Sequence, residues 1–323
     1  MNTIHTYLNP NQALLTGYYY EQDAALPNSE ARPAVLVFGG GAYMHITIKE
    51  RDPIAMAYLH YGYNAFVLHY SVTGNSDGSP KVDKEHVMEA SLQDAKEALH
   101  YLREHAQEFN INPNQITVVG FSAGGNLALR LATTIDEKPN ALVLGYAASE
   151  KLKEFKQETI FDAIDEKMPP TFLFHTAFDA TLPSSQSLKL ALRLQEKGIP
   201  FETHIFLTGD HGLSLAIHNT GYNNKDVAKW HELSLRFLDT IFHKTNYIWG
   251  DLIDEKPSIK MRNDILLSKQ STKRVIEKNI PEHMDKMVEN PFFASLSFER
   301  YAKVMQMDAE VVSKIKEELR ALE

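Results

Sequence analysis

The 323-residue chain contains no cysteine. This absence excludes disulfide bonds, thiolate metal sites and a cysteine nucleophile, and it fits a reducing compartment. The sequence also lacks any run of about eighteen apolar residues, the length that a membrane-spanning helix needs. The first residues, MNTIHTYLNPNQALL, lack the basic segment and apolar core of a signal peptide. We therefore expect a cytoplasmic protein that does not contact a membrane.

A basic stripe is absent as well. Acidic residues outnumber basic ones by 42 to 33, the formal net charge is -9, and no run of Lys or Arg stands out. Such a chain is a poor partner for nucleic acid. Hydrophobic residues make up 43% of the sequence, the composition of an ordinary globular protein. This length and composition predict one large domain with a sizeable core, accompanied by a small one.

Short β-rich runs alternate with longer amphipathic stretches in the first three quarters of the chain. The expected strands are residues 14–21, 34–38, 63–70, 116–119, 141–146, 171–175 and 201–206. The expected helices are residues 53–61, 87–106, 126–133, 184–197 and 227–242. This alternation predicts an α/β protein with a mostly parallel sheet and helices on both of its faces. The charged stretch 149–168 interrupts the rhythm, and we interpret it as a short cap over the site.

The character of the sequence changes from about residue 244. Charged helical segments follow, with Pro257, Pro281 and Pro291 as breaks and without strand-like runs. Apolar side chains in the expected helix 309–322 argue against a disordered linker. We therefore predict a catalytic domain over residues 1–243 and a helical module or docked tail over residues 244–323. Homo-oligomerisation through this module is a hypothesis.

The strongest chemical motif surrounds Ser122. The strand 116–119 leads into Gly120-Phe121-Ser122-Ala123-Gly124-Gly125, and a helix is expected directly afterwards. A serine at such a strand, turn and helix junction is the nucleophile elbow of serine hydrolases. The alternative is a glycine-rich turn in which Ser122 only caps the helix.

A serine hydroxyl is a weak nucleophile, so it needs a base that takes its proton and an acid that orients the base. Asp179 follows the expected strand 171–175, and His211 follows the expected strand 201–206. The order Ser122, Asp179, His211 is the order of α/β-hydrolase triads. Because parallel strands end at one edge of their sheet, three loops at that edge can bring these residues together.

Other residues compete for the roles of base and acid, since the chain has fourteen histidines. The alternatives considered are His45, His69, His175, His204 and His218 for the base, and Asp162, Asp165 and Asp210 for the acid. His69, His175 and His204 lie within expected strands, where packing or surface roles are commoner. Asp162 and Asp165 precede the strand of Asp179, and Asp210 adjoins His211 and is expected to point away from it.

The oxyanion of an acyl-transfer reaction needs preorganised N–H donors. Three glycines, Gly39 to Gly41, follow the strand 34–38, and we predict that the amides of Gly40, Gly41 and Ala123 form the oxyanion hole. A phosphate cradle or a flexible turn is the alternative.

Three aromatic residues flank this predicted site. Tyr43, Phe121 and Phe178 are expected to shape the pocket for the acyl group or the alcohol of the substrate. The alternative is that these side chains belong to the core or the rim of the domain.

Residues 10–242 resemble the acetyl-esterase and xylan-esterase branch of the α/β-hydrolases, which is related to the hormone-sensitive-lipase-like carboxylesterases. The resemblance rests on Phe38-Gly39-Gly40-Gly41-Ala42-Tyr43, Glu50 and Pro53, Gly62-Tyr63, Leu68-His69-Tyr70-Ser71, the Ser122 motif, Pro169-Pro170-Thr171-Phe172, Asp179 with Pro183, and His211-Gly212. Phe38 departs from the family, where His or Pro commonly precedes the glycines. The resemblance implies hydrolysis of short acyl esters, often acetyl groups on sugars, through an acyl-enzyme that needs no metal or organic cofactor.

The last part of the chain has a resemblance of its own. Residues 265–322 are similar to a small helical module found beside carbohydrate-active enzymes and esterases of bacteria. The similarity rests on Val275-Ile276-Glu277-Lys278, Ile280-Pro281 and Asn290-Pro291.

Two rival functions remain open at this point. Peptidases of the prolyl-oligopeptidase type use the same elbow and triad order, but they usually carry a large amino-terminal β-propeller, and only 33 residues precede strand 34–38. The second rival is a non-catalytic hydrolase fold that acts as a binding protein. The sequence favours a serine esterase with a small-molecule ester as its substrate.

Overall fold

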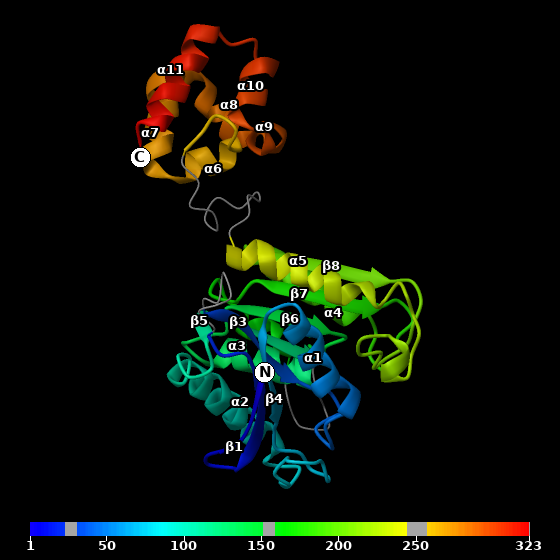
Figure 1. The fold of residues 1–323 in the computed structure, drawn as a ribbon. Helices are drawn as coiled ribbons and strands as arrows, with labels where there is room; N and C mark the ends of the chain where they lie inside the picture. Colours follow the sequence, from blue (N-terminus) through cyan, green and yellow to red (C-terminus); the bar gives the residue numbers. More distant parts are fainter. Residues whose placement is uncertain (23–30, 151–158, 244–256, 323) are drawn as a thin grey trace. The chain divides into compact units, whose positions relative to one another are not determined.

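The computed structural model describes residues 1–22, 31–150, 159–243 and 257–322 (Figure 1). The chain divides into two compact units, Met1–Leu238 and Asp239–Glu323. This division falls inside helix α5 (Lys229–His243), slightly before the predicted boundary at residue 243.

The described residues of the first unit form an eight-stranded sheet in the order β1-β2-β4-β3-β5-β6-β7-β8. The pairs β1–β2 and β2–β4 are antiparallel, and all other neighbouring strands of the sheet run parallel. The strands are β1 (Asn2–Leu8), β2 (Ala13–Tyr19), β3 (Arg32–Phe38), β4 (Asn64–His69), β5 (Ile111–Phe121), β6 (Ala141–Gly145), β7 (Thr171–Thr176) and β8 (Phe201–Phe206). The predicted mostly parallel sheet is confirmed, and β1 is an edge strand that the sequence analysis missed.

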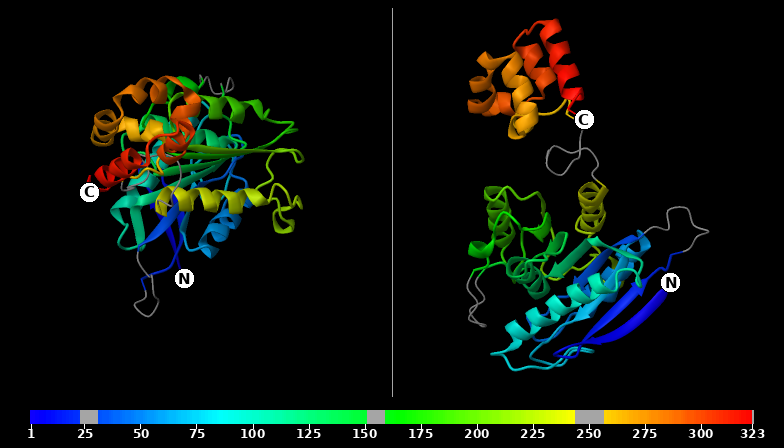
Figure 2. Two further views of the ribbon diagram at one scale, coloured as in Figure 1. Left: turned by 90° about the horizontal axis from the view of Figure 1, so that it is seen from above. Right: turned by 90° about the vertical axis from the view of Figure 1, so that its left-hand side faces the viewer.

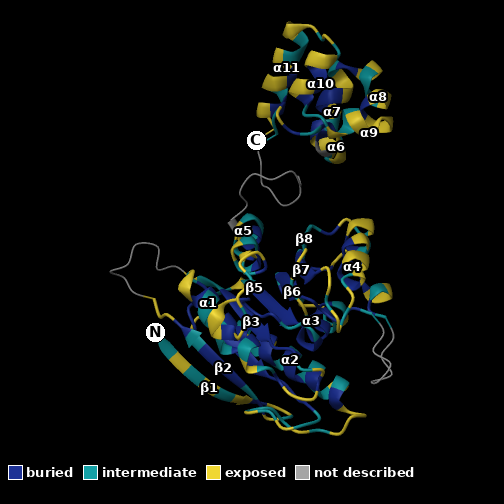
Figure 3. Cartoon of the chain, turned by 90° about the vertical axis from the view of Figure 1, so that its right-hand side faces the viewer, coloured by how far each residue is buried: buried dark blue, intermediate teal, exposed yellow. Residues whose placement is uncertain are grey.

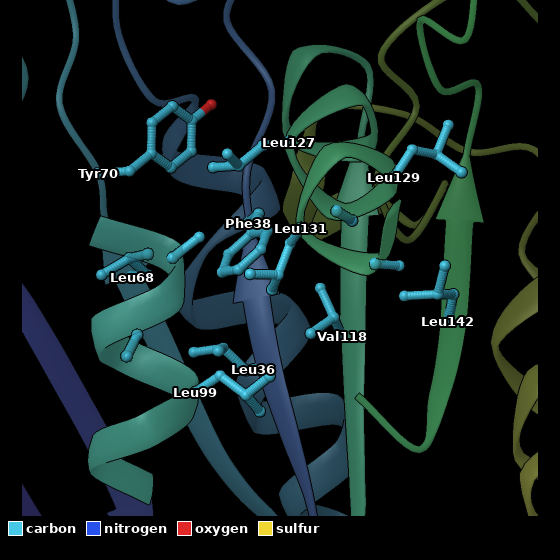
Figure 4. Close-up of a cluster of buried hydrophobic side chains, with 14 of the residues drawn as sticks. Leu36, Phe38, Leu68, Tyr70, Leu99, Val118, Leu127, Leu129, Leu131 and Leu142 are labelled. Atoms are coloured by element: carbon cyan, nitrogen blue, oxygen red, sulfur yellow. The ribbon is translucent and has the colours of Figure 1, made fainter. Parts of the chain in front are cut away.

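Helices cover both faces of the sheet, as the alternation of elements predicts (Figure 2, Figure 3). They are α1 (Asp52–His60), α2 (Val87–Glu104), α3 (Ala123–Thr134), α4 (Ser185–Glu196) and α5. On one face, Leu36, Phe38 and Val118 of the strands share a buried cluster with side chains of α2 and α3 (Figure 4). Side chains of α4 belong to the same cluster. On the other face, the rings of Phe121 and Phe174 contact Trp230 of α5. The alternation of side chains along each buried strand therefore fills two separate cores.

The parallel strands position the candidate site. Because β3, β5, β7 and β8 run in the same direction, the loops that follow them emerge at one edge of the sheet. Gly39 to Gly41, Ser122, Asp179 and His211 all follow these strand ends. This topology brings together residues that are up to 172 positions apart, since 211 − 39 = 172.

The predicted cap at residues 149–168 lies partly outside the described residues, because 151–158 are not described. The described remainder contains a short 3₁₀ turn, Phe161–Ala163. Ile160, Ile164 and Met168 are buried in the same cluster as the α4 side chains. These three residues therefore belong to the core of the first unit.

The second unit is helical, as predicted, and has its own buried core. Its helices are α6 (Asn263–Ser268), α7 (Gln270–Asn279), α8 (Met284–Glu289), α9 (Pro291–Ser295), α10 (Phe298–Val304) and α11 (Ala309–Arg320). Leu266, Ile276, Tyr301 and Ile315 are completely shielded from solvent within it. Among the described residues of the chain, no helix combines the length and apolar character needed to cross a membrane.

Candidate active site

Ser122 stands at the junction of β5 and α3 with φ 50° and ψ −116°. This backbone conformation is sparsely populated for a residue with a side chain. Gly124 makes the junction possible, because a Cβ atom on it would lie 2.1 Å from the carbonyl oxygen of Phe38. The side chain of Ser122 remains partly exposed. Tight packing behind the serine thus turns its hydroxyl toward solvent.

The imidazole of His211 lies between Ser122 and Asp179. Its Nε2 is 2.9 Å from the Ser122 Oγ, and its Nδ1 is 2.7 Å from the Asp179 Oδ2. Because an ionised carboxylate only accepts hydrogen bonds, Nδ1 carries the ring proton and Nε2 accepts the hydrogen of the serine hydroxyl. The structure therefore brings together the three residues that the sequence analysis grouped as nucleophile, base and acid.

Asp179 accepts four hydrogen bonds, and its side chain is fully shielded from solvent. Oδ1 accepts from the amides of Thr181 (2.9 Å) and Leu182 (2.7 Å). Oδ2 accepts from His211 and from Nε2 of His175 at 3.1 Å. Burial alone raises the pKa of Asp179, but the hydrogen bonds from His175, His211 and Leu182 outweigh it and hold the pKa well below its usual value. Asp179 is therefore ionised at neutral pH.

His175 is expected from the sequence to have a packing or surface role, yet it contacts Asp179 directly. Its Nε2 also lies 3.0 Å from the carbonyl oxygen of Leu182, and its Nδ1 lies 2.8 Å from the Ser187 hydroxyl. Both partners of Nε2 are acceptors, so Nε2 carries the proton. His175 and His211 thus donate to the same oxygen of Asp179.

The neighbouring Asp210 does not bond the imidazole ring of His211. Its Oδ1 accepts from the backbone amides of Ala180 (2.9 Å) and His211 (2.7 Å). These hydrogen bonds tie the loop of Asp179 to the loop of His211. Asp210 therefore shapes the backbone around the site, while Asp179 orients the ring.

The oxyanion prediction needs one correction. The amide of Gly40 donates to Oε2 of the buried Glu50 at 2.8 Å, so the prediction that it faces an oxyanion is not met in this structure. The amides of Gly41 and Ala123 donate no hydrogen bond to another described residue. Gly40 itself lies against Ser122, because a Cβ on it would be 2.9 Å from Cβ of Ser122. Two of the three predicted donors thus remain available.

Two of the three aromatic residues do not line a substrate pocket. Tyr43 is completely buried, and its hydroxyl donates to Asn126 at 2.8 Å. Phe121 is also completely buried, because the last residue of β5 points toward α5. The prediction that these two side chains shape a pocket is therefore wrong. Phe178 is 72% exposed beside Asp179, and its role stays a prediction.

Sequence reasoning also missed the contacts of Glu50 and Tyr146. The Tyr146 hydroxyl donates to Oε1 of Glu50 at 2.6 Å, and its ring meets the His211 ring edge to face with centroids 4.9 Å apart. The segment ITIKERDP around Glu50 looks like a solvated charged loop. Glu50 is nevertheless only 2% exposed.

Comparison with known proteins decides the family. A family model described as BD-FAE matches residues 23–139, and the model of the prolyl oligopeptidase family matches residues 140–245. The crystal structure of an α/β-hydrolase enzyme from a Medee basin deep-sea metagenome library is 38% identical, with a TM-score of 0.67, and the match covers 74% of this chain and 97% of that one. The chain belongs to the α/β-hydrolase family.

Other relatives of this α/β-hydrolase are named as esterases or xylan-degrading proteins. The acetyl ester-xyloside bifunctional hydrolase from Caldicellulosiruptor lactoaceticus is 30% identical, with a TM-score of 0.59, over 72% of this chain and 89% of that one. Endo-1,4-beta-xylanase B of Butyrivibrio fibrisolvens is 27% identical over 216 residues, which are 57% of this chain and 33% of that protein. The chain spans about a third of the length of this curated relative. The resemblance to acetyl and xylan esterases is confirmed.

A surface pocket of about 730 Å³ is lined in part by residues 45–49, which follow the loop of Gly39 to Gly41 (the predicted oxyanion loop). Nine of its twelve lining residues carry polar side chains, among them Thr47, Lys49, Asn75, Asp77 and Asn219. Nζ of Lys49 donates to the Tyr222 hydroxyl and lies 3.6 Å from the place of a Cβ on Gly212, the residue after His211. The pocket therefore adjoins the loop that carries His211.

Proposed function

We propose that the chain is a serine esterase that hydrolyses short-chain acyl esters, with acetyl as the preferred acyl group. The observation that carries the proposal is the continuous hydrogen-bond relay from Ser122 through His211 to Asp179, with distances of 2.9 and 2.7 Å. This relay is the arrangement that makes a serine hydroxyl nucleophilic.

In the proposed reaction, Oγ of Ser122 attacks the carbonyl carbon of the ester while Nε2 of His211 takes the hydroxyl proton. The carbonyl oxygen becomes an oxyanion next to the amides of Gly41 and Ala123. The carbon–oxygen bond to the alcohol then breaks, and the leaving alkoxide receives the proton from His211. The acyl group stays on Ser122 as an ester.

Hydrolysis of this acyl-enzyme repeats the same steps with water. His211 takes a proton from water as the water oxygen attacks the acyl carbon, and it returns this proton to Oγ of Ser122 when the acid leaves. Asp179 stays ionised and stabilises the imidazolium that forms in both halves of the reaction. Preorganised donors at the oxyanion contribute about 3 kcal/mol each to such a reaction.

A sugar is the proposed alcohol. The names of the relatives from Caldicellulosiruptor and Butyrivibrio point to xylan and its acetyl esters. The polar pocket beside Lys49 supports this choice, because hydroxyl-rich alcohols need hydrogen-bonding side chains around them. Acetylated xylo-oligosaccharides are therefore the proposed natural substrate class.

A serine peptidase is the second candidate, since the model of the prolyl oligopeptidase family matches residues 140–245. That segment contains Asp179 and His211, which esterases and peptidases of this fold share. The match is therefore compatible with either reaction, and a direct assay has to separate them.

The test compares the full-length protein with its Ser122→Ala variant on p-nitrophenyl acetate, butyrate and octanoate, on acetylated xylo-oligosaccharides, and on a prolyl p-nitroanilide. We expect turnover to fall from acetate to octanoate, acetate release from the oligosaccharides, and loss of both in the variant. Turnover of the anilide alone would favour the peptidase. Ester turnover that survives in the variant would refute Ser122 as the nucleophile.

A further inference from the structure

Glu50 is a buried acid that the proposed reaction does not use. It ends the 3₁₀ turn η1 (Ile48–Glu50) and has only 2% of its surface exposed. Burial raises the pKa of Glu50, while hydrogen bonds from Tyr146 and Gly40 act in the opposite direction. An acid is costly to bury without a compensating arrangement of donors, so each of its partners is informative.

Both oxygens of the Glu50 carboxyl are occupied by donors from different loops. Oε2 accepts from the amide of Gly40 at 2.8 Å, in the loop that follows β3. Oε1 accepts from the hydroxyl of Tyr146 at 2.6 Å, directly after β6. One carboxyl group therefore joins two segments that approach the nucleophile from different strands.

The connection continues from Tyr146 into the loop of the base. The amide of Ser214 donates to the Tyr146 oxygen at 2.9 Å, and the Ser214 hydroxyl donates to the carbonyl oxygen of Lys49, next to Glu50. Nε1 of Trp230 donates to the Ser214 carbonyl at 2.8 Å. These hydrogen bonds form one closed network, called the Glu50 circuit below. It connects Gly40 with Ser214, three residues after His211, and returns through Lys49 to the turn of Glu50.

The directions of these hydrogen bonds require a side chain at position 50 whose two terminal atoms, here Oε1 and Oε2, both accept. The Tyr146 oxygen already accepts from Ser214, and burial keeps the Tyr146 hydroxyl protonated by raising its pKa well above the usual value. This hydroxyl donates its proton to Oε1 of Glu50. The Gly40 amide is likewise only a donor, so a glutamine at position 50 would turn its NH₂ group toward one of the two donors.

We propose that Glu50 is a positioning residue that holds the loop of Gly39 to Gly41 and the loop of His211 at fixed positions relative to each other. It acts through Gly40 and Tyr146 and does not touch the substrate. The hydrogen bond to Gly40 anchors the backbone directly before the amide of Gly41. The Tyr146 ring, held by its hydroxyl, supports the edge of the His211 ring. This inference rests on the proposed esterase function for its kinetic part only.

The kinetic test measures kcat and KM for p-nitrophenyl acetate in the wild type, Glu50→Gln and Tyr146→Phe. We expect Glu50→Gln to lower kcat by about 100-fold, the effect of one lost oxyanion donor, with KM little changed. Tyr146→Phe keeps the ring beside His211, so its loss is smaller. In the double variant the loss is less than the product of the two single losses, because both belong to one circuit. Glu166→Gln, at an exposed acid paired with Lys197, is the matched control and leaves kcat unchanged.

A second readout does not depend on turnover. Hydrogen exchange measured by mass spectrometry should rise in Glu50→Gln in the peptides around Gly40 and around His211 to Ser214, while peptides of β5 and β7 keep their protection. In Tyr146→Phe the increase should be confined to the peptide around Ser214. This pattern separates a positioning role from general destabilisation, which raises exchange throughout the first unit.

These measurements test the esterase function and the positioning role of Glu50 separately. Wild-type ester turnover that Ser122→Ala abolishes, together with unchanged kcat and unchanged exchange in Glu50→Gln, overturns the positioning role and leaves the esterase proposal intact. Absence of ester turnover in the wild type overturns the esterase proposal, and the exchange pattern still decides whether Glu50 couples the two loops. If Glu50→Gln does not fold, Tyr146→Phe decides, and unchanged exchange around Ser214 in that variant overturns the inference.

Discussion

Replacement of Asp179 by asparagine tests the relay most directly, because the carboxylate accepts hydrogen bonds from four donors. Oδ1 faces the amides of Thr181 and Leu182, and Oδ2 faces the ring nitrogens of His175 and His211. Asparagine offers only one oxygen, so its NH₂ group must face one of these donor pairs. The backbone amides cannot change, and the NH₂ group therefore turns toward the histidines.

His211 adapts by moving its ring proton from Nδ1 to Nε2. In this tautomer Nε2 donates to Ser122 and no longer accepts the hydroxyl proton, so the base is lost. We expect kcat to fall by about 10⁴-fold, which corresponds to about 5.4 kcal/mol in the activation barrier. Loss of charge from the hydrogen bonds costs about 1.5–3 kcal/mol of folding free energy, which leaves a domain of ordinary stability folded.

The assay is steady-state hydrolysis of p-nitrophenyl acetate with urea denaturation in parallel, and Ser122→Ala gives the background. Asp210→Asn is the matched control, because its Oδ1 can still accept from the amides of Ala180 and His211, and we expect nearly wild-type kcat. Wild-type kcat in Asp179→Asn would refute the tautomer argument. A loss in Asp210→Asn as large as that in Asp179→Asn would move the orienting role to Asp210.

Two further predictions concern a glycine and a buried histidine. Gly41→Ala should lower kcat by about 10²- to 10³-fold, because the added Cβ would lie 2.1 Å from the His45 carbonyl oxygen and displace an oxyanion amide. Gly198→Ala, also at positive φ but with open space around it, should reduce only stability, and equal losses of kcat in the two variants would contradict the assignment. Burial among aromatic rings lowers the pKa of His231 from 6.5 to about 4, so the unfolded chain binds this proton more tightly and stability falls as the pH drops through that interval. Urea denaturation at pH 7 and pH 4.5 measures this fall, and His231→Phe should remove about 2 kcal/mol of it. An unchanged pH dependence would contradict the role of His231.

Local sequence was sufficient to predict the strand, turn and helix junction at Ser122 and the proximity of Ser122, Asp179 and His211. Ser122 is flanked by glycines that the tight junction requires, and Asp179 and His211 follow apolar runs that read clearly as buried strands. Parallel strand direction then determines the edge at which all three emerge. These features depend on short segments and on general rules of topology, so the sequence alone predicts them.

The supporting contacts depend on tertiary structure and were not predictable in this way. Glu50 bonds Gly40 and Tyr146, 10 and 96 positions away, and nothing in its charged surroundings signals burial. Phe121 adjoins Ser122 in sequence, yet strand alternation points its ring toward Trp230. The direction of the Gly40 amide likewise depends on where the turn of Glu50 packs. Sequence neighbours of a nucleophile are therefore poor guides to the walls of its pocket.

The backbone of Ser122 has a consequence for how this molecule can change over evolutionary time. A residue at φ 50° and ψ −116° costs about 1–3 kcal/mol relative to a relaxed one. Hydrogen bonds from Ser122 to Gly145, and from Asn126 and Ala148 to Ser122, hold it there. Glycine at this position would relieve the strain and make the protein more robust to heat. Selection for stability alone would thus favour glycine at this position, so a serine here is explained by its chemistry.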